Sequence, residues 1–374
     1  MVDPSLFTLP YDQAFCTGLA AAGAEVTLIG RPLRPAETLQ ARGFAFAPLF
    51  YRHAESRLGR GALGRALKGV EHAAGLLRLV RLARRQRPDV IHLQWLVLPP
   101  LDDPGYARLA RYAPLVFTAH NSVAFHGSAA RLQRLGHDRA LRRFGHYVAH
   151  TEPTARHLVA MGLPRERITV LDHPPLTLDT PAPAAGSRHD GITRILLFGA
   201  LKPYKGIDLL VRAGIELARR RQDFAIVIAG QPFMPLDGLQ AEIAAAGATD
   251  RFVIEPRFLT EAELAARLAA ADLVVFPYRE IDASGALALA AGLGKPILAS
   301  SVGVFAEPPA AGLIGAVPPG DVPALAAALE LLVADPAARA RLAEGSRRLA
   351  TSLTGWPAFA EACLEIYRRL PRPG

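Results

Sequence analysis

The sequence predicts an α/β protein made of two doubly wound domains, each with a parallel sheet between layers of helices. Short runs rich in Val, Ile, Leu and Ala alternate with longer amphipathic segments along all 374 residues, as strand–helix repeats do. These runs are almost continuously apolar, which is typical of strands buried on both faces. The pattern breaks once, at the Pro-, Ala- and Gly-rich stretch 173–191, and the length suits two domains.

Ten apolar runs are the expected strands, and most are separated by segments of helical length. In order along the chain they are 24–29, 89–94, 114–120, 146–150, 168–172, 193–200, 224–230, 251–255, 272–277 and 296–300. The aperiodic stretch between the fifth and sixth runs is typical of a linker between domains. We therefore expect a first domain at 1–175, a hinge at 176–191, a second domain at 192–353, and a terminal helix and tail at 354–374.

The start of the chain departs from this pattern, because only Met1 and Val2 precede Asp3. A doubly wound domain opens with a full strand, so either the first strand is very short or the chain has lost residues there. The turn that follows, DPSLFTLPYD, contains no glycine. It is therefore not a dinucleotide-binding fingerprint, which needs glycines at this turn.

Composition and charge narrow the functional classes. No apolar run approaches the roughly 18 residues of a membrane span. We expect neither a signal peptide nor disulfide bonds, and we therefore expect a cytoplasmic protein. The net charge is +9, and residues 1–178 carry 23 Lys and Arg against 13 Asp and Glu. This excess favours an anionic partner such as nucleic acid, an anionic lipid surface or a diphosphate-bearing substrate. The alternative explanation of the positive charge is an Arg-rich composition that follows from a GC-rich genome and not from a partner.

The segment FGALKPYKG places two lysines and two glycines directly after an expected strand. Ligands of open parallel sheets bind outside the carboxyl ends of the strands. Gly199 ends the strand, and the next helix opens after a second glycine, so its free N–H groups favour an anion there. Lys202 and Lys205 add two positive charges. The segment predicts a diphosphate site; lysines that are merely solvated are the alternative.

A second segment, SGALALAAGLGKP, follows the expected strand 272–277 and supports the same ligand. Ser284 is a good helix N-cap, and Gly285 allows a phosphate to approach the backbone closely. Ordinary capping of the helix, without a ligand, is the alternative interpretation.

These motifs, in the order GALKPYKGIDLL, VIAGQ, FVIEPRFLTEAELAARLAAADLVVFPYRE and SGALALAAGLGKPILASSVG, resemble the donor-binding domain of family 4 glycosyltransferases. HLQW, TAHN and HTE are similar to the acceptor-side domain, and GWPAFAEACLEIYRRL to the terminal helix that crosses back to it. The resemblance covers nearly the whole chain. It implies the GT-B fold, in which two Rossmann-like domains face a cleft, and transfer of a sugar from a nucleotide-diphosphate sugar, for example UDP- or GDP-linked.

The resemblance also implies donor-site residues. Lys205 would neutralise the diphosphate, and Lys202 would replace the arginine that relatives carry where this chain has Ala200. Gly230 would let the nucleotide approach its strand, while Phe258 and Leu259 would hold the base. The full set implied for the donor is Gly199, Lys202, Lys205, Gly230, Phe258, Leu259, Tyr278, Glu280, Asp282, Ser284 and Gly285.

One departure from the family concerns its two glutamates, spaced by seven residues. The corresponding positions here are Ile281 and Leu289, which cannot ionise, so the chain resembles a subset with SGAL in place of the first glutamate segment. Glu280 and Asp282 are the candidates to replace the carboxylate that binds the ribose. The family favours retention of anomeric configuration, and this departure leaves inversion open.

On the acceptor side, His120 ends an expected strand, and by resemblance it contacts the transferred sugar. By the same reasoning, the residues expected to bind the acceptor are His92, Gln94, Trp95 and Asn121. Trp95 would fit equally well as a core residue. Asp12 lies near an expected helix start. It either caps that helix or, in an inverting enzyme, takes the proton of the acceptor hydroxyl.

The sequence contains no metal-ligand spacing, so we expect no metal and no other cofactor, with lysines and helix N-termini stabilising the departing diphosphate. The expected helix 66–87 carries Arg78, Arg81 and Arg85 on one face beside leucines. It would suit peripheral binding to the inner face of an anionic membrane, where family members extend polyprenyl-diphosphate-linked saccharides. A solvated helix face is the alternative.

The leading hypothesis is therefore a glycosyltransferase of exopolysaccharide or cell-envelope synthesis acting on a saccharide or lipid-linked saccharide. The second hypothesis is a GT-B epimerase-like enzyme. A phosphorylase is disfavoured, because the sequence has no motif for the pyridoxal phosphate that such an enzyme needs. A nucleic-acid-binding module lacks any recognisable recognition element, so we expect no nucleic-acid partner. A transferase that binds without turnover also stays open.

Overall fold

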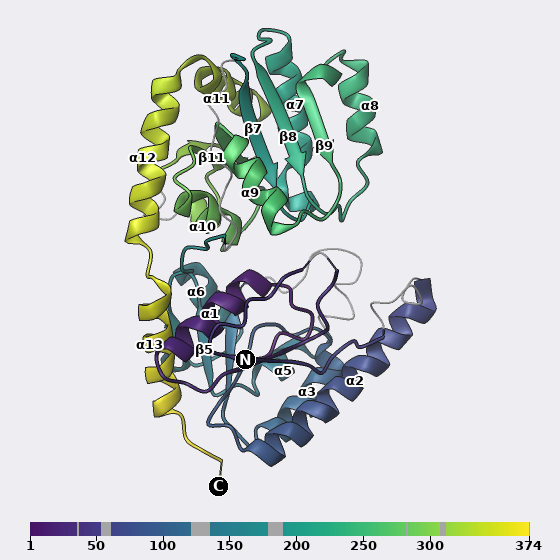
Figure 1. Ribbon diagram of the computed structural model, residues 1–374, viewed down its shortest axis with the longest axis vertical. Helices are drawn as coiled ribbons and strands as arrows, with labels where there is room; N and C mark the ends of the chain where they lie inside the picture. Colours follow the sequence, from purple (N-terminus) through teal and green to yellow (C-terminus); the bar gives the residue numbers. More distant parts are fainter. Residues whose placement is uncertain are drawn as a thin grey trace. The chain divides into compact units, whose positions relative to one another are not determined.

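The computed structural model describes residues 1–35, 37–53, 61–120, 135–178, 190–281, 283–306 and 312–373. The chain forms two compact units: unit 1 comprises Met1–Pro174 with Thr354–Gly374, and unit 2 comprises Pro175–Leu353. Each unit has a parallel sheet with helices packed on it (Figure 1). The predicted class, α/β with two doubly wound domains, is confirmed.

Unit 1 contains two sets of parallel strands, β1-β2 and β3-β4-β5-β6. Its elements are α1 (Leu9–Ala21), β1 (Thr27–Gly30), β2 (Ala45–Pro48), α2 (Gly61–Gln86), β3 (Ile91–Leu93), α3 (Pro99–Leu109), β4 (Leu115–Ala119), α5 (His137–Leu141), β5 (His146–Ala149), α6 (Glu152–Ala160), η2 (Arg165–Arg167), β6 (Ile168–Val170) and α13 (Trp356–Arg369). Alternate residues of these strands, such as Leu115, Phe117 and Ala119 of β4, share one core cluster with residues of α2, α3, α5 and α6.

A single residue links the two sets of strands. Val2 bridges Ile29 of β1 and Leu93 of β3, both in parallel. Its N–H donates to the His92 carbonyl at 2.8 Å, and its own carbonyl accepts from Gln94 N–H at 3.0 Å. Val2 therefore occupies the position of the first strand, and the strand order reverses at this residue. The segment after Val2 accordingly lies where doubly wound sheets bind ligands.

The C-terminal helix α13 belongs to unit 1, as the sequence predicts, and it packs on α1 (Figure 1). The two helices approach closely at Gly18, where an added Cβ would lie 3.3 Å from the Cβ of Ala360. The Phe15 and Phe359 rings meet edge to face with centroids 5.0 Å apart. Packing of this amphipathic helix, rather than its own propensity, holds the chain end in place.

Unit 2 has a six-stranded parallel sheet in the order β12-β11-β10-β7-β8-β9. Its elements are β7 (Thr193–Phe198), η3 (Pro203–Lys205), α7 (Ile207–Ala218), β8 (Phe224–Ala229), α8 (Asp237–Ala245), η4 (Thr249–Arg251), β9 (Phe252–Glu255), α9 (Glu261–Ala270), β10 (Leu273–Phe276), α10 (Gly285–Gly292), β11 (Ile297–Ser300), η5 (Gly303–Phe305), β12 (Gly315–Val317), α11 (Val322–Ala334) and α12 (Pro336–Ser352). The order reverses between β7 and β10, which makes the loops after these two strands the expected ligand site.

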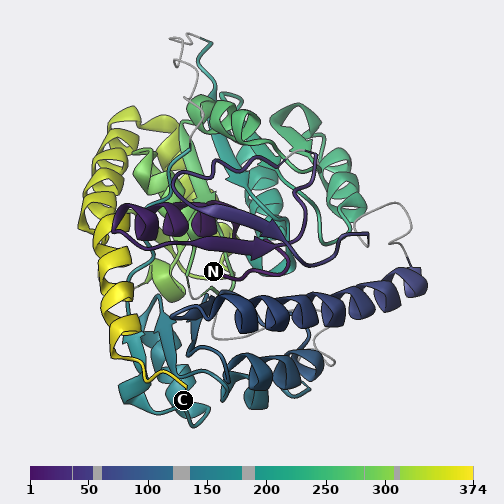
Figure 2. The ribbon, with the colours of Figure 1, turned by 60° about the horizontal axis from the view of Figure 1, so that its bottom comes forward.

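The segment predicted as a hinge begins inside unit 2. Leu176 and Leu178 pack against the core of that unit, so the first residues of the predicted hinge contribute to packing. Residues 179–189 lie outside the described part of the chain. Figure 2 shows α2 as a long straight helix, and none of the described helices is both long and apolar enough to cross a membrane.

Candidate active site

In unit 2 the loops that follow β7 and β10 are joined by direct contacts. The Arg279 N–H donates to the Tyr204 carbonyl at 2.8 Å, and the Arg279 guanidinium pairs with Asp208 at 2.7 Å. Gly206 has φ +66°, and a Cβ there would lie 1.9 Å from the carbonyl oxygen of Pro277. The two loops can therefore meet only because residue 206 has no side chain.

Lys205 lies between these loops and is buried, with 7% of its surface exposed. Its Nζ lies 5.3 Å from the centroid of the Tyr278 ring and 3.1 Å from the point where a Cβ of Gly199 would stand. Burial, and then the nearby charge of Lys202, lower the pKa of Lys205 to about 8. No carboxylate among the described residues forms an ion pair with it. A buried ammonium group without an anion is costly, and a bound anion would offset that cost.

Three other predicted donor residues surround this lysine. Lys202 is half-buried with its Nζ 5.7 Å from the Phe233 ring centroid, and burial lowers its pKa. Tyr278 is buried, and its hydroxyl has no partner within the described residues. The structure thus brings Gly199, Lys202, Lys205 and Tyr278 together at the reversal of strand order.

Ser284 caps α10, because its Oγ accepts from the Leu287 N–H at 3.1 Å. Gly285 is the first residue of that helix. The capping interpretation is therefore confirmed. An anion at this end of α10 would also meet the positive end of the helix dipole.

The remaining predicted donor residues have mixed outcomes. A Cβ on Gly230 would lie 1.9 Å from the Gly199 carbonyl oxygen, so close packing of two loops already requires this glycine. Phe258 is exposed and Leu259 is partly buried, both after β9. Glu280 is exposed and Asp282 lies outside the described residues.

Unit 1 carries a row of polar and aromatic side chains just after β3, β4 and β5. His120 Nε2 lies 2.8 Å from Gln94 Oε1, and the His120 ring stacks on Trp95 with centroids 5.0 Å apart and planes 12° apart. Burial and the neighbouring histidines lower the pKa of His120 well below its usual value, so the ring is neutral. Because an amide oxygen only accepts, Nε2 carries the proton and Nδ1 is left as an acceptor.

Two buried side chains of this row were not predicted as site residues. His150 directly follows β5, and the Tyr11 ring lies 4.8 Å from the His120 ring and 5.4 Å from the His150 ring. Within the described residues, His150 Nε2 and the Tyr11 hydroxyl have no partner. The sequence feature that could have predicted His150 is its position at the end of a strand. The same feature led to the prediction of His120. Asn121 lies outside the described residues.

His92 has a different role from the one predicted. Its Nδ1 lies 2.5 Å from the Tyr367 hydroxyl of α13, and its Nε2 lies 2.7 Å from Thr118 Oγ1. Both ring nitrogens are therefore occupied inside unit 1, which leaves neither for an acceptor. The side chain fixes α13 against the sheet.

Asp12 does not cap α1, so that interpretation is wrong. The N-cap position is Thr8, and Asp12 is the fourth residue of the helix, fully buried. One carboxyl oxygen lies 3.4 Å from Thr8 Oγ1, while the other has no partner within the described residues. Burial and then the charge of Asp3 raise the pKa of Asp12 well above its usual value. Its burial, rather than the pKa, argues against a base here, because a base must come within hydrogen-bond reach of the acceptor hydroxyl.

Comparison with known proteins assigns a family model to each half of the chain. Residues 10–172 match the family model described as Glycosyl transferase 4-like domain, and residues 192–335 match Glycosyl transferases group 1. The chain is 31% identical over 321 residues to D-inositol 3-phosphate glycosyltransferase of Thermobispora bispora, covering 79% of this chain and 73% of that protein. The protein belongs to the GT-B glycosyltransferases. Its two units thus correspond to the two domains of that family.

Two further similarities agree with this assignment. The glycosyltransferase is 35% identical over 108 residues to GDP-mannose:glycolipid 4-beta-D-mannosyltransferase of Xanthomonas campestris, which is 28% of this chain and 30% of that protein. Its fold is similar to that of Anabaena HepE, solved in complex with UDP and glucose, with a TM-score of 0.72 at 16% identity over 99% of this chain and 98% of HepE. No group of three His, Cys, Asp or Glu side chains within the described residues could hold a metal ion.

Proposed function

We propose that this glycosyltransferase moves a sugar from a nucleotide-diphosphate sugar to a hydroxyl group of a saccharide or lipid-linked saccharide. Lys205 carries this proposal. It is a buried cation without an anionic partner among the described residues, and it lies where the strand order of unit 2 reverses. A diphosphate supplies the missing negative charge.

The proposed chemistry is electrostatic and independent of a metal. Negative charge grows on the departing diphosphate as the bond to the sugar breaks, and the Lys205 ammonium and the start of α10 stabilise that charge. Neutral His120 accepts a hydrogen bond from the transferred sugar at Nδ1. Because the Asp12 carboxyl group is fully buried and does not face solvent, we propose retention of configuration, and an NMR analysis of the anomeric product tests it.

A thermal-shift screen tests the donor class. UDP, GDP, ADP and dTDP are each added to the full chain, with UMP and uridine as references. We expect one or more diphosphates to raise the melting temperature by mass action, and the monophosphate and nucleoside to act far more weakly, because Lys205 holds the diphosphate. We favour UDP or GDP, since the names of similar proteins include both. Equal responses to UDP, UMP and uridine would contradict the assigned role of Lys205.

Nucleotide affinity is expected to fall as the pH rises through about 8, where Lys205 loses its proton in the empty protein. A diphosphate binds the protonated lysine better, so it raises the pKa of this residue and takes up a proton on binding. The dissociation constant then increases by up to about tenfold per pH unit above that value. The phosphate groups do not contribute, because their last pKa is about 6. Isothermal titration at several pH values measures the profile, and Lys205→Arg should flatten it.

For the acceptor, the exposed face of α2 supports a lipid-linked saccharide at an anionic membrane surface. Val70 and Leu77 are 68% and 51% exposed, and Arg81 and Arg84 continue the same face. Arg78, predicted on this basic face, instead donates to the Leu49 carbonyl at 2.9 Å. Co-sedimentation with vesicles containing and lacking anionic lipid measures this docking.

A further inference from the structure

The loop between Val2 and α1 points a large apolar side chain outward. Phe7 is 62% exposed, whereas Leu6 is only 4% exposed. Leu6 has φ 46°, a left-handed conformation that costs a residue other than glycine about 1–2 kcal/mol. Gly30 makes room for Leu6, because a Cβ there would lie 2.5 Å from Leu6 Cδ2. The turn thus buries one apolar residue and exposes the next.

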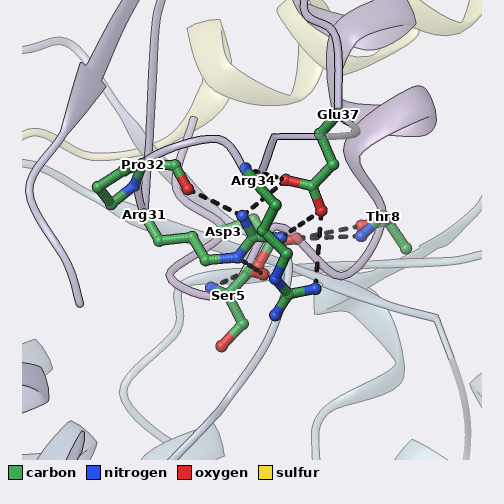
Figure 3. A network of polar contacts seen from close by, with 7 residues as sticks. All are labelled: Asp3, Ser5, Thr8, Arg31, Pro32, Arg34 and Glu37. Carbon is green, nitrogen blue, oxygen red and sulfur yellow. Dashed lines mark hydrogen bonds and ion pairs between the residues drawn. The ribbon is translucent and has the colours of Figure 1, made fainter. Parts of the chain in front are cut away.

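A network of polar contacts holds this turn (Figure 3). The Asp3 carboxylate accepts from the N–H groups of Ser5 and Thr8 at 3.1 and 3.2 Å. Arg31, which is fully buried at the end of β1, donates from Nε to the Ser5 carbonyl at 2.9 Å. Its two terminal nitrogens bind both carboxylate oxygens of Glu37 at 2.6 and 2.7 Å. The outward position of Phe7 is therefore built into the fold of the loop.

Trp95 lies beside Phe7 with its ring orientation fixed. The two rings meet edge to face, with centroids 5.6 Å apart and planes 72° apart. The indole N–H donates to Thr8 Oγ1 at 3.1 Å, and the indole also stacks on His120. Trp95 is only partly buried. An exposed phenyl ring and an anchored indole thus form one aromatic corner at the end of β3.

We infer that Phe7 and Trp95 form a platform on which a pyranose ring of the acceptor stacks. This inference rests on the proposed function and adds the residues that contact the acceptor. The C–H groups of a sugar ring carry partial positive charge and pack on the electron-rich faces of aromatic rings. The corner lies where the strand order of unit 1 reverses, the position at which such sheets bind ligands.

The polar groups around this corner favour a neutral ring over an anionic lipid surface. The carboxyl groups of Asp3 and Asp12 both lie within 3.4 Å of the Thr8 hydroxyl, which anchors Trp95. Among the described residues, no Lys or Arg lies over the Phe7 or Trp95 ring. A surface that bound anionic headgroups would instead surround exposed aromatic residues with basic side chains.

Tryptophan fluorescence tests the platform, because Trp95 and Trp356 are the two tryptophans of the chain. In a Trp356→Phe background, emission reports on Trp95 alone. The probes are D-glucose, D-mannose, D-galactose and N-acetyl-D-glucosamine at millimolar concentrations. We expect a saturable change with at least one sugar, weakened roughly three- to tenfold by Phe7→Ala and kept by Phe7→Tyr. Leu331→Ala, a similarly exposed apolar position on α11 of unit 2, is the matched control and should change nothing.

The platform is overturned by no response to any of the four sugars, or by equal affinity with and without the Phe7 ring. Loss of vesicle binding in Phe7→Ala without loss of sugar binding would assign Phe7 to a membrane instead, and would also overturn it. If Trp356→Phe unfolds the protein, saturation-transfer NMR of the same sugars on the otherwise unchanged chain gives the same comparison. The thermal shift with UDP and GDP is measured on each variant. It distinguishes failure of the platform proposal from failure of the proposed function.

Discussion

Lys205→Met is expected to abolish the nucleotide-induced rise in melting temperature and to weaken diphosphate binding by at least about thirtyfold. Removing one member of a buried charge pair costs about 2–5 kcal/mol, which is the basis of this magnitude. The same variant should be no less stable than the original protein when empty. Burial lowers the pKa of Lys205 from 10.5 to about 8, a penalty of about 3 kcal/mol that methionine does not incur.

The combination of retained stability and lost binding is the decisive result, because a misfolded variant could not produce it. Lys295→Met is the matched control within unit 2. Lys295 Nζ donates to the carbonyl oxygens of Ala269 and Ala271 at 3.2 and 3.0 Å, so its removal should lower stability and leave the nucleotide response intact. If Lys205→Met kept the full response to diphosphates, Lys205 would not belong to the donor site.

Gly206→Ala is expected to destabilise unit 2 by about 4 kcal/mol or more, a range reserved for severe local conflicts. The new Cβ would lie 1.9 Å from the Pro277 carbonyl oxygen, which is backbone and cannot rotate away. The loops after β7 and β10 would have to separate, so the nucleotide response should fall as well. Urea unfolding followed by circular dichroism gives the change in the free energy of unfolding.

Gly191→Ala is the control for this experiment, because it measures the cost of the left-handed backbone conformation without the steric contact. Gly191 has φ +68°, close to the +66° of Gly206, yet a Cβ there would meet no atom within 4 Å. It should cost only the roughly 1–2 kcal/mol of a left-handed residue with a side chain. Equal losses in the two variants would mean that the contact with Pro277 does not hold the loops together.

Much of the proposed donor site could be assembled from the sequence because its parts are close along the chain. Gly199, Lys202 and Lys205 lie within one strand-to-helix connection, and the sheet order then brings them to the expected edge. The capping role of Ser284 could be predicted equally well from the sequence, because a capping residue and its partner N–H are three positions apart. Local spacing and the direction of parallel strands were sufficient for these assignments.

The roles of His92 and Asp12 depended on segments far away in the sequence. His92 contacts Tyr367, which is 275 residues away, and no pattern around HLQW indicates this pairing. Asp12 lies near a helix start, but burial and then the charge of Asp3 raise its pKa. The exposure of Phe7 depends on Gly30 and Arg31 in the same way.

The sequence by itself therefore determined the α/β class, the return of the C-terminal helix and the lysine-bearing loop of unit 2. Apolar periodicity and short-range motifs encode these features, because the residues concerned are neighbours along the chain. Only the tertiary structure decided which side chains are buried, paired or left without a partner. Burial and pairing set the cost of a charge, and they arise when distant segments pack together.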